Sequence, residues 1–136
     1  MSVYQYTPSM VANGPILPRR FVSLDGTRAY GVVQSGVGSY PFGISQEGTH
    51  NAPGTTADNG NAADTGQTLK VYGYGSAEVG LVLGTGGCTP GAFLKPDANG
   101  AGVVAGAGDL CGALALEGGS AGEIVRVLVI QPFVHP

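Results

Sequence analysis

Residues 93–108 read FLKPDANGAGVVAGAG, and the same order of residue types occurs once before in the chain. FVSLDG at 21–26 matches the beginning of this stretch, and GVVQSGVG at 31–38 matches GVVAGAG at 102–108. In both places short apolar runs are joined by Asp, Asn and Gly, the residues that favour tight turns. The stretch therefore predicts short β-strands joined by turns, and its recurrence predicts two related halves.

Two further pairs of segments continue the repeat in the same order. They are FGISQEG (42–48) with CGALALEG (111–118), and GQTLKVYG (66–73) with GEIVRVLV (122–129). The offset falls from 93 − 21 = 72 to 122 − 66 = 56, because the first copy has a longer connection at 49–65. We expect two pseudo-repeated halves, about 21–74 and 93–130, in one small β-barrel or sandwich.

The apolar runs have the lengths and spacing of an all-β protein. Strand-like segments recur at intervals of roughly ten residues, with Gly, Asn or Pro between them. EIVRVLVI at 123–130 is the clearest strand because most of its residues are β-branched, and we expect Pro132 to end it. LCGALALEG at 110–118 has some helical propensity but is too short to predict a helix.

Composition limits the classes of partner. The 136 residues carry a net charge of −3, and only 11% are charged, against about 25% in ordinary globular proteins. A nucleic-acid-binding protein normally has a concentrated basic patch, so we expect no direct nucleic-acid partner. No apolar run approaches the roughly 18 residues that span a bilayer, and the first residues do not resemble a secretion signal, so we expect no membrane partner.

Residues 1–18 differ from the rest of the chain. They contain no charge, three prolines at positions 8, 15 and 18, and the tyrosines Tyr4 and Tyr6. Prolines at this spacing favour an extended chain. Such a segment is either a frayed tail or an arm that orders against a neighbouring subunit, and we prefer the arm. Residues 19–136 then form the single β-barrel-like domain.

Candidate partner contacts come from the two ends of the chain and from the connection 49–65, which has no large apolar residue. An exposed connection of this kind moves or orders against a partner. The residues that we expect to contact partners are Tyr4, Tyr6, Met10, Val11, Ile16, Leu17, His50 and Phe133.

Chemical sites find little support in the sequence. Glu47 and His50 lie three residues apart, but Glu47-Gly48 matches Glu117-Gly118 in the second copy, where no histidine is near. This points to a repeated strand-end turn. Gly118 to Gly122 matches the G-x-S-x-G nucleophile motif around Ser120, but a strand follows it where the motif requires a helix.

The remaining candidates have plainer interpretations. Tyr72 and Tyr74 alternate on one strand and could stack on a sugar, although a barrel face or subunit contact is the commoner use. Cys88 and Cys111 are expected to be free thiols in a cytosol. We expect no enzyme activity, no metal and no cofactor.

Taken in order, RRFVSLDG (19–26), FLKPDANGAGVV (93–104) and GGSAGEIVRVLV (118–129) resemble the small capsid decoration, or head cement, proteins of tailed bacteriophages. The resemblance runs from about Arg19 to Ile130 and leaves out the arm and the 49–65 connection. It implies a β-barrel-like protein, commonly a homotrimer, that binds the phage major capsid protein on the outer surface of the head. There it would clamp neighbouring capsomers against the pressure of packaged DNA, after synthesis in the bacterial cytoplasm.

Two alternatives stay open. The first is a glycan-binding module on the virion surface or tail, which would present the 49–65 connection and the tyrosines. The second is a hydrolase, which would require Ser120 or His50 for activity.

Overall fold

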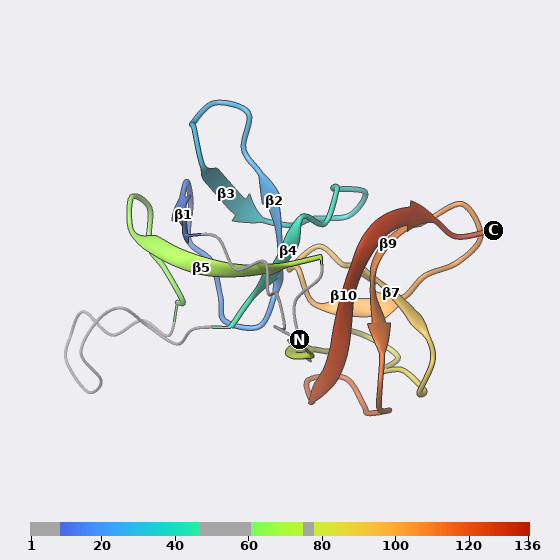
Figure 1. Cartoon of the computed structure of the whole chain (residues 1–136). Helices are drawn as coiled ribbons and strands as arrows, with labels where there is room; N and C mark the ends of the chain where they lie inside the picture. Colours follow the sequence, from blue (N-terminus) through green and yellow to red (C-terminus); the bar gives the residue numbers. More distant parts are fainter. Residues whose placement is uncertain (1–8, 47–60, 75–77) are drawn as a thin grey trace, which may run out of the picture.

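The computed structural model describes residues 9–46, 61–74 and 78–136. All named elements in these ranges are β-strands (Figure 1). In chain order they are β1 (Ser9–Ala12), β2 (Phe21–Leu24), β3 (Gly31–Gln34), β4 (Gly43–Ser45), β5 (Thr68–Gly73), β6 (Val79–Val82), β7 (Phe93–Pro96), β8 (Gly102–Val104), β9 (Leu110–Ala115) and β10 (Ile124–Val134). The predicted all-β fold is confirmed.

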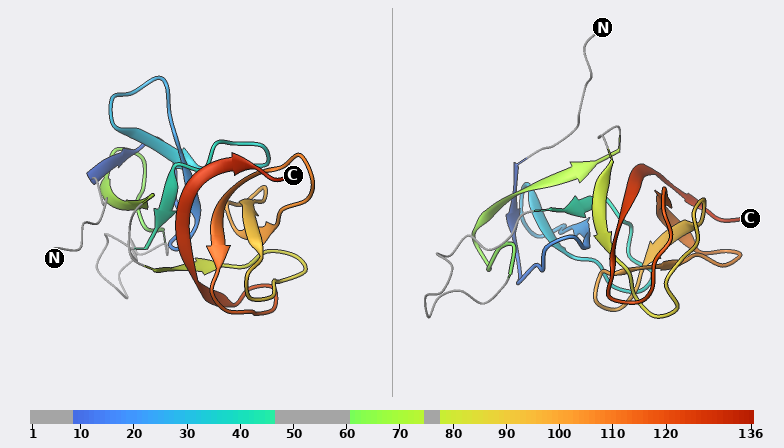
Figure 2. Two further views of the ribbon diagram at one scale, coloured as in Figure 1. Left: turned by 45° about the vertical axis from the view of Figure 1, so that its right-hand side comes forward. Right: turned by 90° about the horizontal axis from the view of Figure 1, so that it is seen from below.

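The strands form two units that follow one another in the chain (Figure 2). In the first unit β1 to β5 make a closed barrel in the order β1-β3-β2-β4-β5, and β1 closes it by pairing antiparallel with β5 and parallel with β3. In the second unit β6 to β10 make a five-stranded sheet in the order β6-β10-β9-β7-β8.

The predicted repeat is confirmed by the order of the strands. The four matched segments place β2 with β7, β3 with β8, β4 with β9 and β5 with β10, which leaves β1 to correspond to β6. With this correspondence the second sheet has the same cyclic order as the first barrel. The pair that would close it, β6 with β8, is reduced to one parallel bridge between Leu83 and Gly102. The second unit is therefore a copy of the barrel that is barely closed.

The structure corrects the expected arm at residues 9–18. Ser9–Ala12 form β1 inside the first barrel, and Ile16 makes an antiparallel bridge with Ala63. The prediction of an extended chain is confirmed for this strand, but the prediction that it lies outside the domain is wrong. The closed barrel needs a strand between β3 and β5, and apolar residues from this segment fill its core. Tyr4 and Tyr6 lie outside the described residues.

Two details of the second unit also differ from expectation. The segment with helical propensity forms β9, and β10 continues past Pro132 to Val134. A register shift between Val129 and Phe133 marks an irregularity in the pairing of β10 with β9. A bulge tolerates proline because one residue there leaves the hydrogen-bonded ladder.

Each unit has its own cluster of buried apolar side chains, but the second cluster includes residues of the first unit. The first cluster contains Met10, Ala12, Ile16, Val22, Val32, Ala63, Leu69 and Val71. The second contains Phe21 and Ile44 together with Val79, Leu81, Leu83, Leu94, Ala113, Ala115, Val125, Val127 and Val129. Phe21 and Ile44, neighbours on β2 and β4, thus join the two units through the second core.

Phe21 is bound to the second unit through its backbone as well. Its N–H donates to the carbonyl of Gly100, in the β7–β8 turn, at 2.8 Å. A β-carbon on Gly100 would lie 3.0 Å from the Phe21 carbonyl oxygen, and Gly100 has a φ of +75°. Glycine is the residue that accepts both this close approach and this backbone conformation.

Phe21→Ala tests whether the two units depend on this contact. Removing a fully buried phenylalanine costs about 3–5 kcal/mol of unfolding free energy, so we expect a large loss of stability in chemical denaturation. Leu24→Ala on the same strand is the control, because Leu24 is 56% exposed and its loss should change stability little. Equal midpoints for the two variants would contradict the role given to Phe21.

Candidate functional site

The residues predicted from the sequence to contact partners differ in how far their side chains are buried. Met10 and Ile16 are buried in the first core, so their side chains do not face outward. Val11 is half-buried in β1, and Leu17 is half-buried with its N–H bonded to the side-chain oxygen of Gln34 at 2.9 Å. Phe133 is half-buried in β10, with its ring edge-on to Phe93 at a centroid distance of 5.1 Å. These five placements leave Phe133, Val11 and Leu17 as partly accessible candidates.

The candidates for chemistry do not converge. Glu47 and His50 lie outside the described residues. Within the described part of the chain no three His, Cys, Asp or Glu side chains gather as metal ligands. Tyr72 packs against the second core while Tyr74 is 61% exposed, so the two rings do not make one stacking platform. No helix among the described residues has the length and apolarity needed to cross a membrane.

Ser120 and Glu117 belong to the turn region between β9 and β10. The backbone N–H of Ser120 donates to the Glu123 carboxylate at 2.5 Å, and the N–H of Arg126 donates to the Glu117 carboxylate at 2.8 Å. Glu117 lies just past the end of β9, as predicted for a strand-end turn, and its carboxylate accepts a backbone donor of β10. Both cysteines are free, and burial raises the pKa of the Cys88 and Cys111 thiols, which disfavours the reactive thiolate.

The most organised polar feature lies where the first unit meets the edge of β6. The side chain of Gln46, just after β4, donates to the Gly80 carbonyl at 2.6 Å and accepts from the Gly80 N–H at 2.9 Å. Two residues further along β6, the N–H of Val82 donates to the Arg19 carbonyl at 3.0 Å. The first unit thus hydrogen-bonds to the strand edge that β8 leaves almost unpaired.

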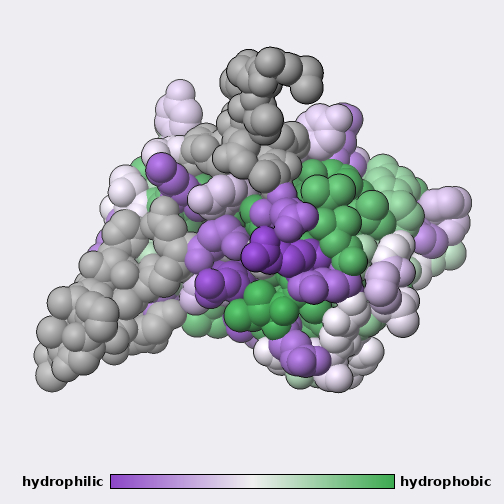
Figure 3. Space-filling model, turned by 60° about the horizontal axis from the view of Figure 1, so that its bottom comes forward, coloured by the Kyte–Doolittle hydropathy of each residue, from purple (hydrophilic) through white to green (hydrophobic). Residues whose placement is uncertain are grey.

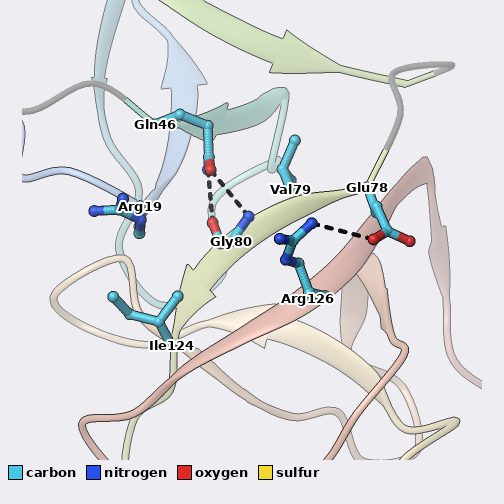
Figure 4. Close-up of a pocket in the computed structure, with 7 residues that line it drawn as sticks. All are labelled: Arg19, Gln46, Glu78, Val79, Gly80, Ile124 and Arg126. Carbon is cyan, nitrogen blue, oxygen red and sulfur yellow. Dashed lines mark hydrogen bonds and ion pairs between the residues drawn. The ribbon is translucent and has the colours of Figure 1, made fainter.

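An open hollow lies over this junction, which we call the seam hollow (Figure 4). Its described lining residues are Arg19, Gln46, Glu78, Val79, Gly80, Ile124 and Arg126. In the close-up, Arg19 and Arg126 lie on either side of Gly80, and the Arg126 guanidinium pairs with the Glu78 carboxylate at 3.1 Å. Figure 3 shows hydrophilic side chains gathered in the middle of the face drawn there, between hydrophobic areas.

A second feature is a set of exposed apolar side chains, which we call the loop surface. It consists of Leu24, Tyr30, Val37, Tyr40 and Val134, each more than half exposed. The segments that carry them are the β2–β3 hairpin, the β3–β4 connection and the end of β10. All three lie toward the upper side in Figure 1 and in the left view of Figure 2.

The hairpin of the loop surface has a fixed shape. The Asp25 carboxylate accepts hydrogen bonds from the Asn13 side chain and from the Thr27 N–H, and these bonds hold the pKa of Asp25 below its ordinary value. Tyr30 has a φ of +57°, which is uncommon for a bulky residue. Its carbonyl accepts the Val11 N–H at 2.8 Å, and its side chain is 73% exposed.

The C-terminal end is fixed by Asp109. Its carboxylate accepts from Lys95 Nζ at 2.7 Å and from the Gly106 N–H at 2.7 Å, so the pKa of Asp109 lies below its ordinary value. The His135 N–H donates to the Asp109 carbonyl at 2.8 Å, and the Gly108 N–H donates to the His135 carbonyl at 2.8 Å. These bonds hold the residues after β10 against the β8–β9 turn.

Comparison with solved structures finds proteins of the same fold. The structure is similar to the crystal structure of the head fiber gp8.5 N base of bacteriophage phi29. The TM-score is 0.68 and the alignment covers 98% of this chain and 100% of that one, with 12% sequence identity. No family model and no curated protein match the sequence. The likeness establishes that the two chains share a fold over their whole length.

Gln46→Met tests the bond to the edge of β6. Methionine has a similar size but leaves the Gly80 N–H and carbonyl without their partner, which costs about 1–3 kcal/mol of unfolding free energy. We also expect faster hydrogen exchange at the Gly80 amide. Gln131→Met, at an exposed position on β10, is the matched control. Unchanged exchange at Gly80 in the Gln46 variant would contradict the role of this side chain.

Lys95→Met should raise the pKa of Asp109, because the ammonium group is the largest cause of its lowering. The folded pKa lies below the unfolded one, so the carboxylate stabilises the fold fully above about pH 4 and this contribution disappears as pH falls through the lowered value. Carboxyl NMR of the full chain measures the pKa directly, with Lys70→Met on β5 as control. Identical Asp109 titration in both variants would contradict the assignment.

Proposed function

We propose that this chain is a structural protein of a tailed-phage virion that binds the outer surface of the head and stabilises adjacent capsomers. The observation that carries the proposal is the likeness, over the whole of both chains, to the base of a phage head fiber. Because fold alone does not determine function, the proposal also depends on the surfaces that this chain presents.

The loop surface suits contact with a protein shell. Large apolar side chains are exposed on three separate segments that lie toward the same side of Figure 1, and exposed apolar surface of this kind often occurs at protein interaction sites. Tyr30 and Tyr40 offer wide contact area with few rotatable bonds. Asp25 holds the turn before Tyr30, and hydrogen bonds between Gly36 and Ser39 hold the connection that carries Tyr40, so binding requires little ordering of the chain.

The proposed mechanism is bridging. A subunit that contacts two capsomers at once opposes their separation, and a homotrimer at a threefold position would multiply such contacts. Linked contacts reinforce one another through effective concentration, so each can be modest. The phage major capsid protein is the proposed partner, and the homotrimer is the proposed assembly.

The direct test mixes the purified full chain with expanded heads of its own phage that lack the protein. We expect co-sedimentation with the heads and a higher temperature of head disruption, because the bound protein links neighbouring capsomers. Light scattering of the free protein should give the mass of three chains. Failure of the full chain to bind these heads would overturn the proposal.

Val37→Ser combined with Tyr40→Ala should weaken head binding by roughly tenfold or more, because both side chains belong to the loop surface. The control is Leu116→Ser, which removes an exposed apolar side chain from the β9–β10 connection at the lower end of Figure 1. Equal affinity of the double variant and the control would remove the loop surface from the head contact.

A further inference from the structure

The floor of the seam hollow is formed by a residue without a side chain. Gly80 lies directly across from Arg126 in the pairing of β6 with β10. A β-carbon on Gly80 would lie 3.1 Å from Ile124 Cγ2 and 3.4 Å from Arg19 Cδ and Nε. Side chains directly opposite on antiparallel strands share a face, so Arg126 projects on the side where Gly80 leaves room.

Arginine side chains from different units therefore line the hollow on either side of one glycine (Figure 4). Arg19 precedes β2 in the first unit and Arg126 lies on β10 in the second. The Arg19 carbonyl is bonded to the Val82 N–H, and the residue has a φ of +56°, so its backbone is fixed beside the edge of β6. Like charges that line one hollow repel each other, and an anion between or beside them relieves this repulsion.

The described lining of the hollow does not balance this charge. Among those residues Glu78 is the single carboxylate, and Arg126 and Glu78 have side chains 62% and 51% exposed. Exposed ion pairs of this type contribute little and are easily exchanged. Glu47, the residue after Gln46, lies outside the described residues. The described hollow thus carries two positive groups and one negative group in a chain whose net charge is −3.

The other residues that line the seam hollow indicate which kind of anion it would bind. The backbone groups of Gly80 are already bonded to Gln46, so the guanidinium groups are the donors that remain for a ligand. Ile124 is 52% exposed beside them and offers an apolar wall. A carboxylate on a short aliphatic stem matches both features. A nucleic-acid backbone repeats its charge over many nucleotides and fits less well, because Glu78 lies in the same hollow.

We propose that the seam hollow binds an acidic side chain, Asp or Glu, of a protein partner. Arginine holds a carboxylate through paired hydrogen bonds, and two arginines set at an angle can hold one carboxylate from two sides. That the partner is the phage capsid protein rests on the proposed function, whereas binding of the carboxylate does not. The site exists only when both units are joined, because each contributes one arginine.

The test uses the full chain and acetyl-triglutamyl amide as the probe, followed by proton–nitrogen NMR. We expect saturable shifts of the Gly80 amide and of the Arg19 and Arg126 Nε–H signals. Acetyl-triglutamine amide has the same shape without charge and should give none of them. Acetate alone, as a third arm, shows whether a free carboxylate suffices or whether the peptide is required.

Arg126→Gln should weaken the binding of the probe by roughly tenfold, because it removes a charge-assisted contact. Arg28→Gln, an exposed arginine in the β2–β3 turn, is the matched control and should leave the affinity unchanged. The absence of saturable shifts, equal shifts with the glutamine peptide, or equal weakening by Arg28→Gln would each overturn the site.

Binding to heads then separates this inference from the proposed function. If the unaltered chain binds heads and Arg126→Gln binds them more weakly, the acidic partner lies on the capsid. If both bind heads equally, the capsid is not the partner of the seam hollow, and this assignment is overturned. If the unaltered chain fails to bind heads while the probe still binds, the proposed function fails and the carboxylate site stands.

Discussion

The fold depends on how the second unit is closed. A five-stranded barrel buries its interior only if its first and last strands meet, and in the second unit β6 and β8 share a single bridge. The first unit supplies hydrogen-bond partners for the edge of β6 and an apolar side chain for the second core. Gln46 and Arg19 bond to the edge of β6, Gly100 accepts the N–H of Phe21, and the side chain of Phe21 enters the second core. The first unit therefore completes the core and the strand edge of the second, although the two repeat the same strand order.

This dependence explains why the candidate surfaces involve both units. The loop surface has residues of the first unit on β2 and on the β3–β4 connection, and a residue of the second at the end of β10. Pro41 in that connection packs against β9, since a β-carbon on Gly112 would lie 2.5 Å from Pro41 Cγ. A rigid junction keeps these side chains in one arrangement, which lowers the entropy that a partner must remove on binding.

The sequence predicts the strands and their duplication well because both depend on local patterns. Turn residues after FVSL and FLKP, and the β-branched run before Ile130, specify strands without reference to distant contacts. Residues 9–18 were misjudged because prolines and missing charge describe an extended chain equally well inside or outside a barrel. The repeat contained the missing signal, since β6 precedes the second copy and required a counterpart before β2. The seam hollow could not be predicted, because Arg19, Gly80 and Arg126 meet only through pairing across the chain.

The place where the two copies differ is also the place where a new site can arise. In the first barrel the edge of β1 is occupied by β3, so backbone groups satisfy one another and leave nothing for a ligand. In the second the edge of β6 is bonded instead to the Gln46 side chain and the Arg19 carbonyl, and Arg19, Gln46 and Arg126 line one hollow around Gly80. An exact repeat would have paired that edge with β8 and covered the glycine. The incomplete closure of the second barrel thus creates both the need for the first unit and the polar hollow between them.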